Sequence, residues 1–347
     1  MVLRSLTQIN FRNLVTPKLE PCTGLTAVAG GNGAGKSNLL EACYLGVTGE
    51  LPGGRIVENL RIGEEQGFVG AGLEHDDGLS SIEVGLAPGR KTLKLDGQTA
   101  RVLDIARVSA AVLITPEDAD LVHGSPSLRR GYLDSLLGRL SPRYSMLIKA
   151  FARVLEQRNA ALRHGLADSD IDVWSERFVE FGQEIDDLRE RAVVRIAELA
   201  AAAYRAIAGD GKELSVSLQR SAAGPLADAL QASRAEERAR GTTVVGPHRS
   251  DLRLDLGGHS AQAFASRGEA RTTALALRVA EFRLLEQRHE ETPVLLLDDF
   301  SAELDPSRRG FLLQLVRAAS QALVTGTEPP PEYDSLMLIQ GGEIARG

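Results

Sequence analysis

Eight consecutive residues near the start of the chain have the types and the spacing of a phosphate-binding loop. Residues 30–37 read Gly-Gly-Asn-Gly-Ala-Gly-Lys-Ser, which fits the pattern G-x-x-x-x-G-K-[ST]. Glycines let successive backbone N–H groups face one anion, and the start of a helix adds positive potential. In this pattern Lys36 is expected to contact the β- and γ-phosphates, and the Ser37 hydroxyl to ligate Mg²⁺. The alternative is a glycine-rich turn that happens to precede Lys-Ser.

A pair of carboxylates, Asp298 and Asp299, directly follows the apolar run of residues 294–297. A buried strand that ends there would bring Asp298 to the edge of a sheet, where it could hold the hydration shell of Mg²⁺. Asp299 would then orient or deprotonate the attacking water. Taken alone, the pair could also cap a following helix. Together with a phosphate loop it predicts an ATPase, with Lys36 and Asp299 as the catalytic residues.

A third pattern, Ser266-x-Gly268, begins the helical run of residues 267–287. Ser and Gly at a helix start can form another phosphate-seeking nest, although an ordinary Ser N-cap is the alternative. The pattern stands 30 residues before Asp298, and 262 residues separate Lys36 from Asp298. A large insertion therefore lies between the two halves of the predicted nucleotide site. The third pattern is expected to face a nucleotide bound to another subunit.

The elements that position these groups come from both ends of the chain. Apolar or alternating runs predict strands over residues 25–29, 67–95 (a small antiparallel sheet), 110–114, 294–297 and 322–325. Helical spacing predicts helices over residues 36–47, 127–138, 142–164, 171–207 and 306–319. We therefore expect an α/β fold, with a head formed by residues 1–120 and 210–347 and a helical insertion over residues 121–209.

Composition excludes several classes of protein. Charged residues make up 25% and hydrophobic residues 43% of the 347 residues, as in ordinary globular proteins. No apolar run approaches the roughly 18 residues that a membrane span needs, so we expect no membrane association. Two cysteines, Cys22 and Cys43, cannot form a disulfide framework, and a cytoplasmic location is the expectation.

Charge is distributed unevenly along the chain. The net charge is −7, yet residues 123–165 hold eight Lys and Arg against two acidic residues, a balance of +6. A basic surface of this kind could bind DNA, and the candidate contacts are Arg143, Lys149, Arg153 and Arg158. The other interpretation, with about equal weight, is that this helix face is neutralised by the acidic helix after Asp170.

Taken together, these residues resemble the ABC-type ATPase heads of the SMC class and, within it, the RecF family. The specific matches include Gly246-Pro247-His248-Arg249 and the run from Asp298 to residues 301–305, Ser-Ala-Glu-Leu-Asp, which is similar to a D-loop. Further matches are residues 9–14, 30–38, 116–118 and 124–126, with Arg129 and Arg130. The resemblance covers nearly the whole chain. It implies a mixed sheet with helices, an antiparallel β subdomain and an inserted helical lobe.

The resemblance also implies a function. Members of the family are ATP-dependent DNA-binding proteins of recombinational repair that form a homodimer around two nucleotides, act at gapped or junction DNA with RecO and RecR, and help RecA to load. Arg12 is expected at the phosphate or adenine, although it could also form a surface ion pair. The residues expected to contact ATP are Arg12, Gly30, Gly31, Asn32, Gly33, Ala34, Gly35, Lys36, Ser37 and Asn38, and Ser266 and Gly268 are expected to meet the partner's nucleotide.

The chain departs from the family pattern at several positions. Arg267 and Glu269 stand where glutamines are expected, and Thr325-Gly326-Thr327 lacks the histidine that transporter ATPases use as a γ-phosphate sensor. Pro116-Glu117 occupies the Q-loop position without a glutamine. These departures count against the alternative function, the nucleotide-binding subunit of an ABC transporter. A metabolic kinase would not explain the signature helix or the 262-residue spacing.

Overall fold

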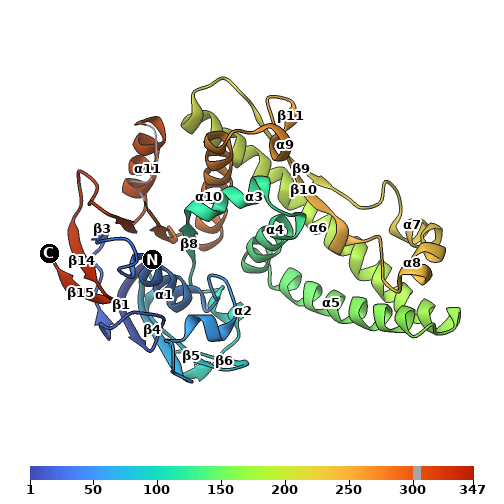
Figure 1. Ribbon diagram of the computed structural model, residues 1–347, viewed down its shortest axis with the longest axis horizontal. Helices are drawn as coiled ribbons and strands as arrows, with labels where there is room; N and C mark the ends of the chain where they lie inside the picture. Colours follow the sequence, from blue (N-terminus) through green and yellow to red (C-terminus); the bar gives the residue numbers. More distant parts are fainter. Residues whose placement is uncertain (300–305) are drawn as a thin grey trace. The chain divides into compact units, whose positions relative to one another are not determined.

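The computed structural model describes residues 1–299 and 306–347, which form two compact units. The unit that we call the head comprises Met1–Asp118, Ala206–Gly209 and Arg278–Gly347. The second unit, the inserted lobe, comprises Ala119–Arg205 and Asp210–Leu277. Figure 1 shows that the head takes its elements from both the blue and the red ends of the chain.

The first sheet of the head carries the predicted nucleotide site. Its strand order is β15-β14-β3-β13-β12-β8, and every neighbouring pair except β14–β15 is parallel. All residues of β12 and β13 are buried, as expected for a parallel sheet covered on both faces. The strands are β3 (Gly24–Ala29), β8 (Ala111–Ile114), β12 (Val294–Leu297), β13 (Gln321–Gly326), β14 (Ser335–Gln340) and β15 (Glu343–Arg346).

The second sheet of the head is antiparallel, with the order β2-β1-β4-β5-β6-β7. Along β4 and β5 buried apolar residues alternate with less buried ones, because one face of this sheet packs on the core. Helix α1 (Lys36–Thr48) contacts strands of both sheets, and α11 (Pro306–Ala318) contacts β3 and β13. The strands are β1 (Val2–Ile9), β2 (Lys18–Leu19), β4 (Gly67–His75), β5 (Gly78–Ala87), β6 (Arg90–Leu95) and β7 (Gln98–Thr99). Short helices η1 (Ile56–Asn59), α2 (Val102–Ile105) and η2 (Pro116–Ala119) connect them to β8 and the lobe.

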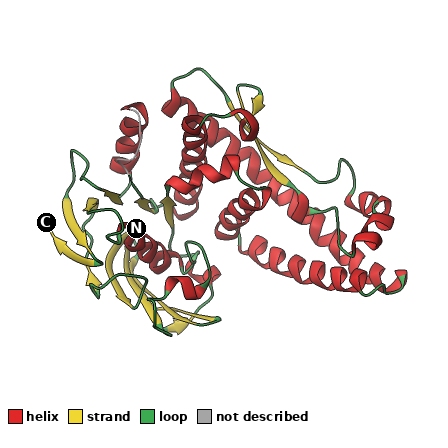
Figure 2. Cartoon of the chain, viewed as in Figure 1, coloured by secondary structure: helices red, strands yellow, loops and turns green. Residues whose placement is uncertain are grey.

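The inserted lobe is mainly helical (Figure 2). Three long helices lie in it: α4 (Pro126–Leu140), α5 (Pro142–Arg163) and α6 (Asp168–Ala208). The last residues of α6, from Ala206 on, belong to the head. Both α4 and α5 begin with Ser-Pro, in which proline supplies a helical φ. The Ser141 hydroxyl caps α5 by accepting the N–H of Tyr144, whereas Ser125 makes no such bond to α4. The shorter helices are α3 (Asp120–His123), α7 (Leu226–Ala232), α8 (Arg234–Arg240), η3 (Pro247–Arg249) and α9 (Ala261–Phe264).

The return to the head comes later than the sequence predicted. We expected the head to resume at residue 210, but residues 210–277 belong to the lobe. The physical reason is a separate three-stranded antiparallel sheet, β11-β10-β9, which pairs only with itself among the described strands. It comprises β9 (Leu214–Gln219), β10 (Asp251–Leu256) and β11 (His259–Ser260). Helix α10 (Arg267–His289) then runs from the lobe into the head.

None of the helices in the described part of the chain combines the length and the apolar character that a membrane crossing requires.

Candidate nucleotide-binding site

The phosphate loop connects the carboxyl end of β3 to the start of α1. Gly35 has φ +112°, and a Cβ there would lie 2.8 Å from Asn13 Oδ1, so only glycine fits this position. The Lys36 ammonium donates hydrogen bonds to the carbonyl oxygens of Gly30 and Gly31, both at 2.9 Å. No carboxylate among the described residues pairs with Lys36, so its charge is available to an anion held over the loop.

A hollow of about 1090 Å³ opens beside the loop and is lined by residues 30–34. Its other walls are residues 15–17, Thr327 and the β14–β15 hairpin. Val15 and Leu338 are about half exposed in it, which gives a partly apolar wall next to the phosphate-binding backbone. A hollow with one apolar wall and one row of backbone donors suits a nucleotide, whose base is flat and apolar and whose phosphates are anionic.

The acidic pair is held by a residue that the sequence analysis did not assign. Thr325 lies at the end of β13, next to β12, and its Oγ1 donates a hydrogen bond to Asp298 Oδ1 at 2.5 Å. The same Oγ1 accepts the N–H of Asp299 at 2.9 Å. Asp299 has φ +53°, a left-handed conformation that aspartate tolerates better than most residues. Because parallel strands end at one edge of a sheet, a threonine on the neighbouring strand could have been found from the sequence.

Arg12 forms a second polar network beside the loop. Its guanidinium lies 2.5 Å from Glu41 Oε2 and donates hydrogen bonds to the side-chain oxygens of Asn38 and Asn59, at 3.2 and 3.3 Å. The pKa of Glu41 is raised, first by burial and then by the charges of Asp298 and Glu117, while Arg12 opposes the shift. Glu41 is therefore close to the acidic pair, and the sequence analysis did not assign it. The surface ion pair left open for Arg12 is present, in a half-buried form.

The oxygen donors of this edge fit Mg²⁺. Ser37 offers an exposed hydroxyl in the first turn of α1, and Asp298 offers a half-buried carboxylate. In the described part of the chain no group of three or more metal-ligating side chains could hold a metal by itself. Mg²⁺ is commonly held by one or two protein oxygens, with water and substrate phosphates as its other ligands. Ser37 and Asp298 together match that arrangement.

Ser266 lies in the inserted lobe and caps α10. Its backbone N–H donates to Glu269 Oε2 at 2.7 Å, and its Oγ accepts the N–H of Glu269 at 3.2 Å, which is a capping box. Lys212 also bonds to the Glu269 carboxylate and, with Ser266, lowers the pKa of Glu269 to about 2. Ser266 therefore forms the N-cap that was the alternative to a phosphate nest, and its hydroxyl is exposed at the helix start. Glu269, which departs from the expected glutamine, is used for this cap.

Two other predicted motifs are the Q-loop position and the D-loop. Pro116 and Glu117 follow β8, the strand beside β12, so the Q-loop position lies at the same edge of the sheet as Asp298. The predicted D-loop, residues 301–305, lies outside the described residues.

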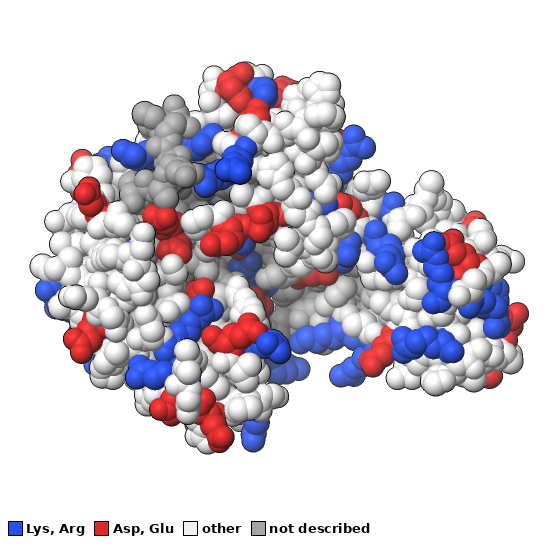
Figure 3. Space-filling model, in the orientation of Figure 1, with Lys and Arg blue, Asp and Glu red and all other residues white. Residues whose placement is uncertain are grey.

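The predicted DNA contacts divide into exposed and buried residues. Arg143, Lys149 and Arg153 are exposed on α5, but the Arg143 guanidinium lies 2.6 Å from Glu184 Oε1 on α6. Arg158 is only 2% exposed and lies 2.6 Å from the fully buried Glu237, so the prediction that it contacts DNA is wrong. Its guanidinium also lies over the ring of Phe178. Figure 3 shows acidic side chains beside several of the basic ones on the drawn face.

Comparisons with known proteins agree with this fold and site. A family model described as an AAA domain matches residues 5–94. The DNA replication and repair protein RecF of Deinococcus deserti is 50% identical, over 95% of this chain and 91% of the relative. RecF of Deinococcus radiodurans is 48% identical, over 99% of this chain and 95% of the relative. The sequence identity and the coverage of both relatives are high enough to establish family membership.

Solved structures give the same result. A structure of the recombination mediator protein RecF with ATP, in the RecFOR pathway, has a TM-score of 0.92 and 28% identity, covering 99% of this chain and 97% of that one. The Smc head domain of Pyrococcus furiosus shares the fold at a TM-score of 0.55 and 17% identity, covering 99% and 95%. The predicted ABC-type ATPase head is thus confirmed, and the transporter alternative is not favoured. The chain therefore belongs to the RecF family of DNA replication and repair proteins.

Proposed function

We propose that this chain is an ATP-dependent protein of recombinational repair and replication, in which ATP binding closes a homodimer on DNA and slow hydrolysis reopens it. The observation that carries the proposal is the shared edge of the parallel sheet. The phosphate loop follows β3 there, and the carboxylates of Asp298 and Asp299 follow β12, fixed by the Thr325 hydroxyl. The identity to RecF proteins supports the DNA-repair context.

The chemistry assigned to each residue follows from its position. The Lys36 ammonium would exchange the carbonyls of Gly30 and Gly31 for the β- and γ-phosphates, since a charged acceptor forms the stronger hydrogen bond. Ser37 and Asp298 would hold Mg²⁺, which neutralises phosphate charge when bound. Asp299 would orient the attacking water and accept its proton. A short aspartate in this place suits slow, switch-like hydrolysis. Stimulation of this hydrolysis by DNA is part of the proposal.

Dimerisation assigns a role to Ser266 and Gly268 of a second copy. This helix start, with Ser266 exposed and Gly268 half-buried, would meet the γ-phosphate bound to the first copy, because backbone N–H groups and the positive helix end attract an anion. The similar RecF structure comes from the RecFOR pathway, which supports RecO and RecR as partners. Gapped or junction DNA as the place of action is part of the proposal. Helping RecA to load is then the expected outcome of the cycle.

Two variants test the cycle at opposite steps. Lys36→Ala removes the charge that faces the phosphates, so ATP affinity should fall roughly tenfold to a hundredfold and the ATP-dependent dimer should disappear. Asp299→Asn keeps the size but removes the base, so ATP should still close the dimer while hydrolysis nearly stops. Sedimentation with and without ATP, Mg²⁺ and duplex DNA measures the dimer, and phosphate release measures hydrolysis.

The two variants separate binding from hydrolysis. Lys36→Ala should lose ATP binding and the dimer, and hydrolysis with them, whereas Asp299→Asn should lose hydrolysis alone. Undiminished dimer formation by Lys36→Ala at ordinary ATP concentrations would refute ATP-driven dimerisation. Hydrolysis at the normal rate by Asp299→Asn would show that another group is the base.

A further inference from the structure

The segment Gly246-Pro247-His248-Arg249 is specific in sequence, and the nucleotide site does not use it. It lies in the inserted lobe, where residues 247–249 form the short helix η3 ahead of β10. Arg130 of α4 bonds to the same turn, because its Nη1 donates to the carbonyl oxygen of Ser250 at 2.9 Å. Two arginines from distant parts of the sequence are thus held at one place.

The turn is rigid. Gly246 has φ +124°, and a Cβ there would lie 2.5 Å from the ring of Phe178, so a side chain is excluded. The His248 ring lies 5.9 Å from the Phe178 ring and 6.2 Å from the Phe151 ring, between centroids. His248 Nε2 bonds to the carbonyl oxygen of Thr243 at 3.2 Å. Burial lowers the pKa of His248 to about 4, so this ring is neutral at pH 7 and adds no charge to the turn.

Arg249 leaves this turn toward solvent. It is exposed, and within residues 1–299 and 306–347 its guanidinium bonds only to the Thr243 carbonyl oxygen, at 3.4 Å. Arg130 is half-buried beside it. Neither arginine has an acidic partner in the part of the chain that the structure describes. Burial lowers the pKa of Arg130, and the charges of Arg189 and Arg249 add to that effect, although Asp251 opposes it.

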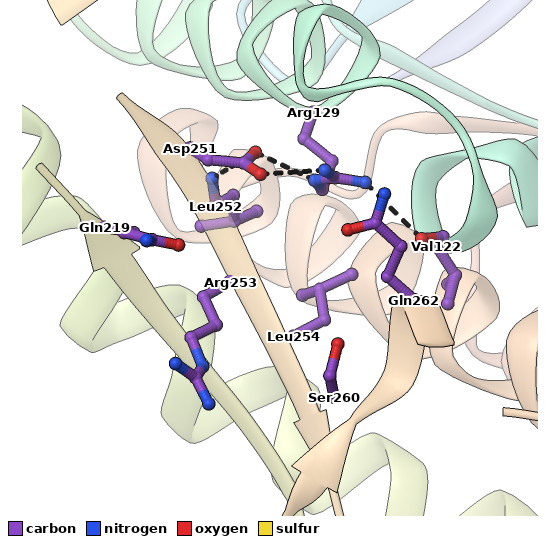
Figure 4. Close-up of a pocket in the computed structure, with 9 residues that line it drawn as sticks. All are labelled: Val122, Arg129, Gln219, Asp251, Leu252, Arg253, Leu254, Ser260 and Gln262. Carbon is purple, nitrogen blue, oxygen red and sulfur yellow. Dashed lines mark hydrogen bonds and ion pairs between the residues drawn. The ribbon is translucent and has the colours of Figure 1, made fainter. Parts of the chain in front are cut away.

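Two acidic residues around the turn, Asp251 and Asp134, already bind other arginines. Asp251 receives two hydrogen bonds of 2.8 Å from Arg129, which Figure 4 shows facing both carboxylate oxygens. Asp134 lies 2.7 Å from the buried Arg189. Asp186 is buried, with one carboxylate oxygen unpartnered among the described residues, and burial raises its pKa to about 6 against the charges of Arg189 and Arg220. Arg130 and Arg249 are therefore the uncompensated positive charges of this cluster.

We propose that Arg130 and Arg249 form a contact site for the phosphate backbone of duplex DNA. This inference rests on the proposed function and assigns part of its DNA-binding surface. A guanidinium offers a planar fork of N–H donors that matches phosphate oxygens. The rigid turn fixes the backbone of Arg249, and the hydrogen bond to the Ser250 carbonyl oxygen orients Arg130, so less entropy is lost on binding. Backbone contacts carry no sequence preference, so the site would position DNA rather than select it.

The test is the salt dependence of duplex binding by an Arg130→Gln, Arg249→Gln double variant of the full chain, with ATP and Mg²⁺ present. The plot of log affinity against log salt has a negative slope, and each phosphate that is no longer neutralised makes it shallower by about 0.9. The slope of the double variant should therefore be shallower by about 1.8. Between about 50 and 200 mM salt, the ratio of wild-type to variant affinity should then shrink about 12-fold. ATP affinity should be unchanged.

Two further variants serve as controls. Arg177→Gln removes the same charge from an exposed arginine that pairs with Glu180 at 2.7 Å, and it should leave the slope unchanged. Arg130→Lys with Arg249→Lys keeps both charges and should retain most of the slope. If the double Gln variant does not fold, Arg249→Gln alone, at an exposed side chain, should lower the slope by about half as much.

An unchanged slope in the Gln variants would overturn the proposal. The same result is expected if the two arginines bind an acidic protein surface and not DNA. A wild-type chain that binds no DNA under any condition would overturn the proposed function as well. If the wild-type chain binds DNA and the variant has the same salt slope, only the assignment of this site is overturned.

Discussion

The phosphate loop of the head and the arginine-rich helices of the inserted lobe use positive charge in opposite ways. Among the described residues, Lys36 bonds only to carbonyl oxygens of its own loop, so its charge remains available to a ligand. In the lobe, Arg158 and Arg189 are almost completely buried and bind Glu237 and Asp134. Those charges hold helices together. A count of basic residues therefore overstates the charge available for binding, and the partner of each residue decides its role.

The largest effect is expected from a variant that breaks one of these buried ion pairs. Arg158→Ala leaves the Glu237 carboxylate buried and without its arginine, and should reduce the free energy of unfolding of the lobe by about 3–5 kcal/mol. Arg153→Ala, on the exposed face of the same helix, should change it by less than about 0.5 kcal/mol. Urea unfolding monitored by the fluorescence of Trp174, which packs near this region, measures both. Equal effects of the two variants would show that burial does not separate their roles.

This contrast explains how much the sequence could predict. The phosphate loop was found because its chemistry lies in eight consecutive residues, and the acidic pair because a buried strand ends directly before it. Glu41 was missed because it joins the site only through helix packing. Thr325 was missed although the parallel pairing of β13 with β12 brings both strand ends to one edge of the sheet. The burial of Arg158 depends on Glu237, 79 residues away. The return to the head was placed too early because β9 and β10 pair with each other, a choice that local patterns do not reveal.

A smaller effect is expected at Thr325, and it sharpens the role of the acidic pair. Thr325→Val keeps the branched shape within β13 but removes the hydroxyl that bonds to Asp298 and Asp299. Loss of a hydrogen bond to a charged group should lower the single-turnover rate of ATP hydrolysis roughly tenfold to a hundredfold. Affinity for ATP should change little, because the phosphate loop is untouched. Thr325→Ser retains the hydroxyl and should retain most of the rate, whereas equal losses in both variants would point to packing instead.

The smallest expected effect concerns Lys149 and Arg153, which share an exposed face of α5 one turn apart. Neither has an ion-pair partner among residues 1–299 and 306–347, whereas Arg143 on the same helix binds Glu184. The two interpretations of this helix therefore apply to different residues.

Reversing Lys149 and Arg153 to Glu should weaken duplex binding at every sequence and lower the salt slope by about 0.9 for each phosphate that is no longer neutralised. The melting temperature should stay the same, because no ion pair is broken. Arg143→Glu is the matched control: it places two carboxylates together, so it should lower the melting temperature and leave the salt slope unchanged. If the double reversal instead lowers the melting temperature without moving the slope, this face of α5 only neutralises α6, and the DNA-binding charge of the lobe must come from elsewhere.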